Sequence, residues 1–203
     1  MPATLGELWL DALERLSGRT AHELKGALNG VAVNLEVVRS RCERPGTAAS
    51  AVASYANSAS DQLGIVIETS EALLALSRSA RTPVDIARVT RYVHALLGPA
   101  ARSHGRRFDL AGPLDGLGAT SADGAAARLA IAASALTATE AWSHVVCRGR
   151  GDGHEATLCL ECTDAEPASC GVEAAVIDAA GRNGIRILVD GPAISITFPS
   201  SGG

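Results

Sequence analysis

Apolar and small residues recur in steps of three and four along two stretches of the first 80 residues, which predicts two long amphipathic helices. Thr4 and Glu7 form a T-x-x-E capping box before the first helix, and Pro45-Gly46 should end it near Arg44. The predicted seam of the first helix is Leu13, Leu16, Thr20, Leu24, Ala27, Val31, Leu35 and Val38. The seam of the second is Val52, Ala56, Ala59, Leu63, Val66, Ser70, Leu73 and Ser77.

A short loop between two long helices predicts an antiparallel hairpin. One hairpin would leave a wide apolar face uncovered. Two hairpins packed as a four-helix bundle would bury it, so we expect a homodimer.

The pattern changes after Arg81, where helices begin to alternate with short strands. Helix starts are predicted at Thr82-Pro83 and at Ser121, and a third helix over residues 172–180. Strands are predicted over residues 108–110, 145–147, 156–162, 185–189 and 193–198. The fold class is therefore α+β, with a helical-hairpin domain over residues 1–80 and a domain of helices on a small sheet over residues 82–203.

Composition narrows the possible partners and the compartment. The chain has 203 residues, a formal net charge of −4 and no basic stripe with interleaved aromatics, which argues against nucleic acid. It has no long uninterrupted apolar run and no signal-peptide pattern at its start, which argues against a membrane partner. Five cysteines without an export signal are read as reduced thiols, so a cytoplasmic protein is expected.

His22 is the residue with the clearest chemical potential. Helical spacing turns it away from the seam residue Leu24 and places Lys25, Gly26 and Asn29 on its own face. A solvent-facing imidazole is a nucleophile, and the adjacent Glu23 can orient the ring and take a proton. A surface histidine with a chance acidic neighbour is the alternative interpretation of this pair.

The segment Ala21-His22-Glu23-Leu24-Lys25-Gly26-Ala27-Leu28-Asn29 resembles the H-box of sensor histidine kinases, H-E-hydrophobic-R/K-N/T-P-L. Gly26 and Ala27 depart from that pattern. The resemblance implies that His22 is a phosphoacceptor, that Glu23 assists it, and that Lys25, Gly26 and Asn29 contact the partner.

The second half resembles the ATP-binding domain of the same kinases but lacks its nucleotide-binding residues. Ala133 and Thr137 stand where the N-box asparagines are expected, and Asp164-Ala165-Glu166-Pro167-Ala168 replaces the D-x-G-x-G box. ATP binding is therefore not expected, and Asp164 is interpreted as a turn residue at a strand end.

This combination resembles the ChpT-type bacterial histidine phosphotransferases. It implies a phosphorelay protein whose His22 accepts phosphate from a response-regulator receiver domain and passes it on. Such a protein needs no cofactor of its own, because the receiver supplies Mg²⁺. Two alternatives are a pseudokinase scaffold that sequesters a regulator or kinase, and a histidine kinase with a divergent ATP site.

Overall fold

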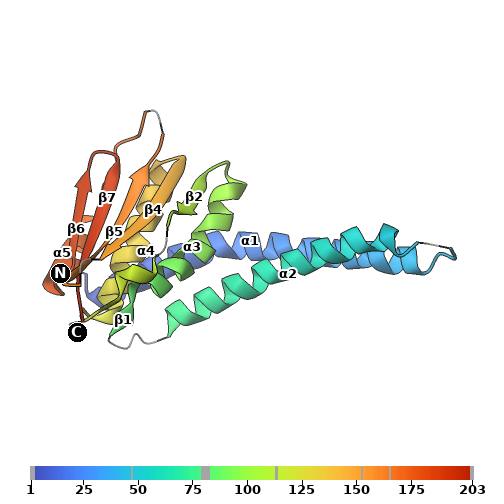
Figure 1. Ribbon diagram of the computed structural model, residues 1–203, viewed down its shortest axis with the longest axis horizontal. Helices are drawn as coiled ribbons and strands as arrows, with labels where there is room; N and C mark the ends of the chain where they lie inside the picture. Colours follow the sequence, from blue (N-terminus) through green and yellow to red (C-terminus); the bar gives the residue numbers. More distant parts are fainter. Residues whose placement is uncertain are drawn as a thin grey trace.

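A long helical hairpin and a helix-covered sheet make up the chain, a mixed α+β architecture (Figure 1). The computed structural model describes residues 3–46, 48–78, 83–112, 114–151, 153–164 and 166–201. The predicted domain boundary at residues 80–82 lies outside these ranges, as does Asp152 in the predicted turn between two strands.

The hairpin consists of α1 (Leu5–Cys42) and α2 (Ser50–Ser77). The capping box is confirmed, because the Glu7 carboxylate accepts from the Thr4 amide at 2.7 Å and the Thr4 hydroxyl accepts from the Glu7 amide at 3.3 Å. The helix ends two residues before the predicted Arg44. Figure 1 shows that the hairpin extends well beyond the sheet, so its far half has only water around it in the isolated chain.

The second half alternates short strands and helices, as the sequence predicts. Its elements are β1 (Val84–Asp85), α3 (Ile86–Ser103), β2 (Arg107–Leu110), the 3-10 turn η1 (Asp115–Leu117), β3 (Ala119–Thr120), α4 (Gly124–Ala141), β4 (His144–Gly151), β5 (Glu155–Cys162), α5 (Ala174–Arg182), β6 (Arg186–Asp190) and β7 (Ala193–Pro199).

The predicted start of the first helix in this half is wrong. Asp85 caps α3, and its carboxylate accepts from the Arg88 amide at 2.9 Å. Val84 pairs with Thr120 in the two-stranded β1–β3 sheet, so the chain is extended just before the cap. Thr82, the predicted cap, lies outside the described residues.

The start of α4 also lies later than predicted. The carboxylate of Asp123 accepts from the amides of Ala125 and Ala126 at 2.9 and 3.0 Å, and so caps the helix. Ser121 instead donates to the Ser200 carbonyl at 3.3 Å, which ties the chain end to this loop. α5 is likewise shifted by two residues from the predicted 172–180.

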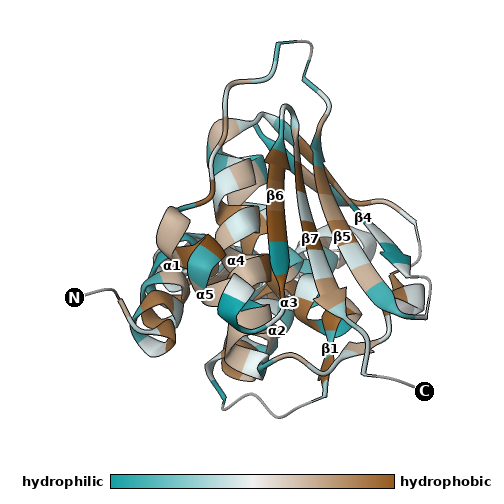
Figure 2. Ribbon diagram, turned by 90° about the vertical axis from the view of Figure 1, so that its left-hand side faces the viewer, coloured by the Kyte–Doolittle hydropathy of each residue, from teal (hydrophilic) through white to brown (hydrophobic). Residues whose placement is uncertain are grey.

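Five strands form the main sheet, in the order β2-β4-β5-β7-β6. The β2–β4 pair is parallel and the other pairs are antiparallel. Helices α3, α4 and α5 lie on one face (Figure 2). Side chains along a strand therefore alternate between a buried and an open face. Leu158 and Leu160 are buried toward the helices, whereas the ion pair Arg148–Glu161, at 3.1 Å, lies on the open face.

The base of the hairpin, where α1 begins and α2 ends, belongs to the same hydrophobic core as the sheet. Ala12 and Leu16 of α1, and Ala72 and Leu76 of α2, are buried in one cluster with residues of α3 and α4. The alanine-rich α4 is buried on nearly every side, and its small side chains let α1 and α3 approach closely. The base of the hairpin is therefore fixed to the sheet domain.

Candidate functional site

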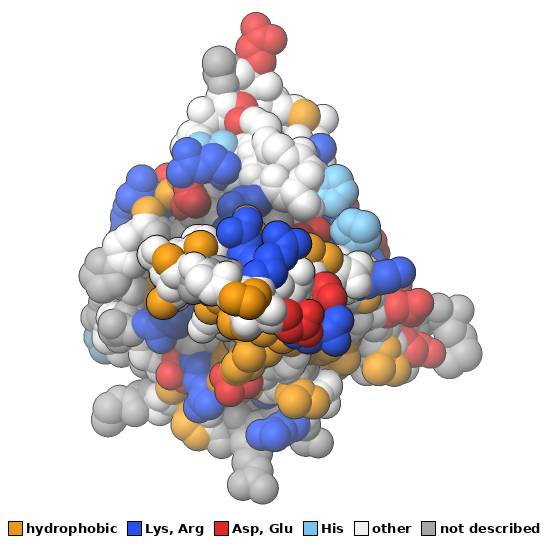
Figure 3. Space-filling model, turned by 90° about the vertical axis from the view of Figure 1, so that its right-hand side faces the viewer, with side chains coloured by type: hydrophobic (Ala, Val, Ile, Leu, Met, Phe, Trp, Pro, Cys, Tyr) orange, Lys and Arg blue, Asp and Glu red, His pale blue; other side chains and the backbone are white. Residues whose placement is uncertain are grey.

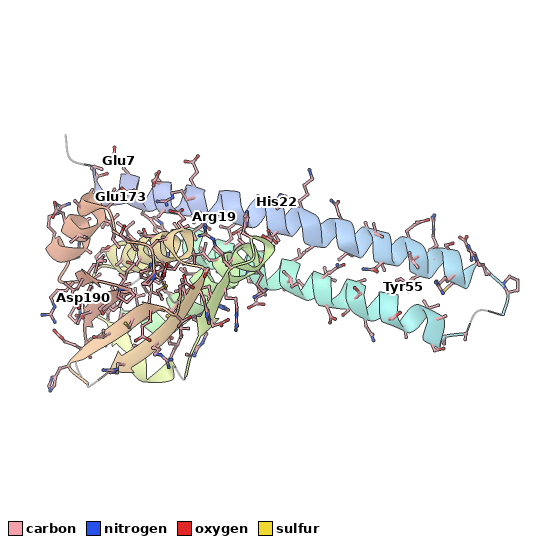
Figure 4. The ribbon with its side chains drawn as sticks, turned by 90° about the horizontal axis from the view of Figure 1, so that it is seen from above. Glu7, Arg19, His22, Tyr55, Glu173 and Asp190 are labelled. Atoms are coloured by element: carbon pink, nitrogen blue, oxygen red, sulfur yellow. The ribbon has the colours of Figure 1, made fainter. Side chains whose placement is uncertain are left out.

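His22 lies on α1 at the point where the hairpin leaves the sheet domain (Figure 4). Its side chain is exposed, as the helical spacing predicts, whereas Thr20 on the seam is buried. Within the described ranges no hydrogen bond joins His22 to another residue. The imidazole is thus open to a partner that approaches from solvent.

Glu23 lies between His22 and the second half of the chain. Its side chain is partly buried, and its Oε1 accepts a 2.8 Å hydrogen bond from the hydroxyl of Ser103, the last residue of α3. The acidic neighbour of His22 is therefore in contact with the sheet domain.

The three predicted partner-binding residues, Lys25, Gly26 and Asn29, are all exposed on α1 beyond His22. A Cβ placed on Gly26 would meet no atom within 4 Å, so this part of the helix face is open. The structure brings these residues to the same side of the hairpin as His22.

Two hollows flank this part of α1. A cavity of about 530 Å³ lies between α1, α3 and α4, and Arg19, His104, Arg106 and Glu140 supply its polar groups. A groove of about 440 Å³ lies between α1, α2 and the end of α3, lined by Glu23, Gly26, Ala27, Gln62, Ile65, Pro99, Arg102 and Ser103. The residue after His22 thus lines one concave surface, and Arg19, one turn before it, lines the other.

Arginines of α1 attach it to the end of α4. Arg15 and Arg19 contact the Glu140 carboxylate at 2.8 and 2.7 Å, and hydrogen bonding to Glu140 raises the pKa of Arg15. Arg106 donates to the carbonyls of Thr139 and Glu140, two of the orphan acceptors at the helix C-terminus. These contacts hold the base of α1 one turn before His22.

The face of α4 that carries Ala133 and Thr137 is covered by α1. The space between them is about 20 Å³, enough for about one water molecule, and Leu8, Asp11, Ala12 and Arg15 of α1 line it together with Val176 of α5. Small-molecule sites are typically about 300 Å³ or larger.

Asp164 has a structural role at the end of β5. Its carboxylate accepts from the hydroxyl and the amide of Ser143 and from the amide of His144 at 3.1 Å. These hydrogen bonds, that of the Ser143 hydroxyl first, lower the pKa of Asp164. The predicted position at a strand end is confirmed, because Asp164 lies two residues after β5, but the chain forms no turn at this residue.

Among the residues that the structure describes, no three His, Cys, Asp or Glu side chains gather closely enough to hold a metal ion. None of the helices there is long and apolar enough to cross a bilayer.

Sequence reasoning missed the residues that surround His22 in space. Ser103 is 80 positions away from Glu23, and no local pattern links the two. Arg19 could have been found, because it precedes His22 by three residues and so shares its face. Glu140, its partner, comes from a helix whose position against α1 only the tertiary structure gives.

No model of a known protein family matches the chain, and no curated protein is similar to it. Solved structures that are similar in arrangement include two histidine kinases. The histidine kinase AdeS of Acinetobacter baumannii has a TM-score of 0.45 and 12% identity, and the match covers 89% of this chain and 98% of that one. The histidine kinase ThkA, solved in complex with the response regulator protein TrrA, has a TM-score of 0.48 and 14% identity, over 95% of this chain and 63% of that one. At this identity the likeness says nothing about activity, and function is inferred from the site.

Proposed function

We propose that the chain is a histidine phosphotransfer protein of a two-component phosphorelay. His22 takes a phosphoryl group from the aspartyl phosphate of one receiver domain and passes it to another. The observation that carries the proposal is an exposed imidazole with an adjacent carboxylate on a helical hairpin. In the same chain, α1 covers the face of α4 that carries Ala133 and Thr137.

The transfer needs only groups that His22 and its partner supply. The unprotonated ring nitrogen of His22 attacks phosphorus, an N–P bond forms, and the O–P bond to the receiver's aspartate breaks, which releases that aspartate as a carboxylate. The proton on the other ring nitrogen passes to Glu23 or to water. The receiver's own Mg²⁺ neutralises the phosphoryl oxygens, and positioning supplies most of the rate.

The covered α4 face supports a function without ATP. Ala133 and Thr137 offer no asparagine side chains for Mg²⁺ and phosphate, and about 20 Å³ between α1 and α4 cannot admit a nucleotide. Asp164, the remaining residue of the D-x-G-x-G position, already holds the β4 start through Ser143 and His144.

The proposal includes a homodimer built from two hairpins. Most large apolar side chains that are exposed in the described residues lie on α1 and α2: Leu10, Leu28, Val33, Leu35, Leu63, Ile65, Ile67 and Leu74. Figure 3, a view onto the hairpin tip, shows apolar side chains interleaved with charged ones on this surface. By helical spacing Leu63, Ile67 and Leu74 share one face of α2, and a second hairpin packed on that face would remove them from water.

Labelling from phosphorylated receivers tests the function. Receiver domains encoded in the same genome are phosphorylated with radiolabelled acetyl phosphate and mixed with the wild-type chain, His22→Ala, or the control His154→Ala, which removes an exposed histidine before β5. We expect acid-labile, base-stable label on the wild type and the control and none on His22→Ala. Regulator binding without any label would instead favour the scaffold alternative.

A further inference from the structure

The hydrogen bond between Ser103 and Glu23 joins the end of α3 to the acidic neighbour of His22. Ser103 Oγ lies 2.8 Å from Glu23 Oε1, 3.0 Å from the Ala100 carbonyl and 3.2 Å from His104 Nδ1. His104 Nδ1 also lies 2.8 Å from the Ala100 carbonyl. One hydroxyl proton must be shared among these groups.

The chemistry of the acceptors assigns that proton. A carbonyl oxygen only accepts, so His104 Nδ1 carries the hydrogen that it directs at Ala100. The hydroxyl hydrogen of Ser103 then has two acceptors, the Ala100 carbonyl and the Glu23 carboxylate, and Glu23 is the charged and nearer one. The Glu23 carboxylate is therefore held from the α3 side, while His22 donates no hydrogen bond to it in the described structure.

We propose that Ser103 is a positioning residue that holds the Glu23 carboxylate away from His22 and so slows phosphorylation of the imidazole. This inference rests on the proposed function, because it concerns the base that takes the proton from His22. The sheet domain acts through this contact as a brake on the phosphoacceptor.

The position of the contact explains how the brake is released. Glu23 and Ser103 form one wall of the 440 Å³ groove, with Gln62 and Ile65 of α2 on another wall. Ser103 is the last residue of α3, so a small movement of that helix end breaks the bond without unfolding the helix. A partner that enters the groove and displaces α3 frees Glu23 to face His22.

The test uses potassium phosphoramidate, a small donor that needs no identified partner. The imidazole nitrogen attacks phosphorus, the P–N bond of the donor breaks, and ammonia leaves. The rate of His22 phosphorylation is measured for the full-length wild type, Ser103→Ala, Ser103→Thr, Glu23→Gln and the Ser103→Ala/Glu23→Gln double variant. Ser77→Ala is the matched control, because Ser77 also ends a helix and bonds the carbonyl three residues earlier at 3.0 Å.

We expect Ser103→Ala to be phosphorylated roughly three- to ten-fold faster than the wild type, the factor that one net hydrogen bond supplies. Ser103→Thr keeps a hydroxyl and should stay near the wild-type rate, as should Ser77→Ala. Glu23→Gln should be slower by about 10²-fold, and Ser103→Ala should bring no gain in that background. A gain that depends on Glu23 cannot come from structural damage.

Two results overturn the proposal and separate it from the function itself. If the wild type is phosphorylated on His22 and Ser103→Ala is equally fast or slower, the brake is wrong and the phosphotransfer function stands. If His22 of the wild type takes no phosphoryl group from phosphoramidate or from any receiver, both are wrong.

Discussion

Asp164 holds its position through hydrogen bonds that only its charged form accepts fully. The hydroxyl and the amide of Ser143 lower the pKa of Asp164 in the folded chain. In the unfolded chain the carboxyl returns to its ordinary pKa of about 3.9. The folded state therefore gains stability from Asp164 above that pH and loses it as the pH falls through the lower, folded pKa.

Asp164→Asn should lower the free energy of unfolding at pH 7, and the difference from wild type should shrink below about pH 4. Urea unfolding of both proteins between pH 7 and pH 3 measures this. Asp190→Asn, which changes an exposed carboxylate at the end of β6, is the control and should leave stability nearly unchanged at both ends. An equal loss for Asp164→Asn at every pH would contradict the role of its charge.

Single residues also show where prediction from sequence stops. The exposure of His22 follows from its position two residues before the seam residue Leu24, because helical geometry alone fixes that angle. The partner of Glu23 does not follow, because Ser103 reaches it only after α3 has packed against α1. Local patterns determine which way a side chain faces, and tertiary packing determines what it meets.

Elements were predicted well wherever a strong local signal marks them. The capping box at Thr4 and the Pro45-Gly46 break bound α1 to within about two residues, and the five strands of the main sheet all appear. The predicted starts of α3 and α4 lie too early because each helix has a second cap-type residue, Asp85 or Asp123, two or three positions later. The β1–β3 pairing keeps the chain extended up to Asp85. The β1–β3 pair was missed because two-residue strands carry no periodicity.

Two glycines in α1 should respond differently to the same substitution. A Cβ on Gly26 meets nothing within 4 Å, whereas a Cβ on Gly30 would lie 2.3 Å from the Gln62 amide nitrogen. Gly26→Ala should stabilise the helix by about 0.5–1 kcal/mol. Gly30→Ala should gain less or nothing, because Gln62 must move and give up its 3.2 Å hydrogen bond from Asn34.

Thermal unfolding of the two glycine variants checks this difference. Gln62→Ala removes the side chain that the new Cβ would displace, so Gly30→Ala in that background should regain the stabilisation seen at Gly26. Equal melting temperatures for Gly26→Ala and Gly30→Ala would mean that Gln62 does not lie across Gly30.

At the scale of the whole molecule, the packing of α1 on α4 bears on nucleotide binding. The four α1 residues that line the 20 Å³ space reach it because α1 extends about five turns before His22 and lies along α4. We therefore expect no saturable heat when Mg-ATP is titrated into the chain at micromolar concentration. Saturable binding in that range would require α1 to leave α4, and would favour the alternative of a kinase with a divergent ATP site.

The hairpin surface leads to the last prediction, a homodimer. Leu63 of α2 is 45% exposed and Leu188 of β6 is 63% exposed in the isolated chain, so exposure alone would make both tolerant to a charge. If two hairpins pair as proposed, Leu63 is buried between them and Leu188 is not. Leu63→Glu should then split the dimer, because an unpaired charge would enter an apolar contact, while Leu188→Glu should leave it intact.

Light scattering at micromolar concentration should give twice the 20.7 kDa chain mass for the wild type and Leu188→Glu and the single mass for Leu63→Glu. A Leu63→Glu protein that keeps the double mass would place the interface elsewhere, and a wild type of single mass would leave the exposed leucines of α1 and α2 to another partner.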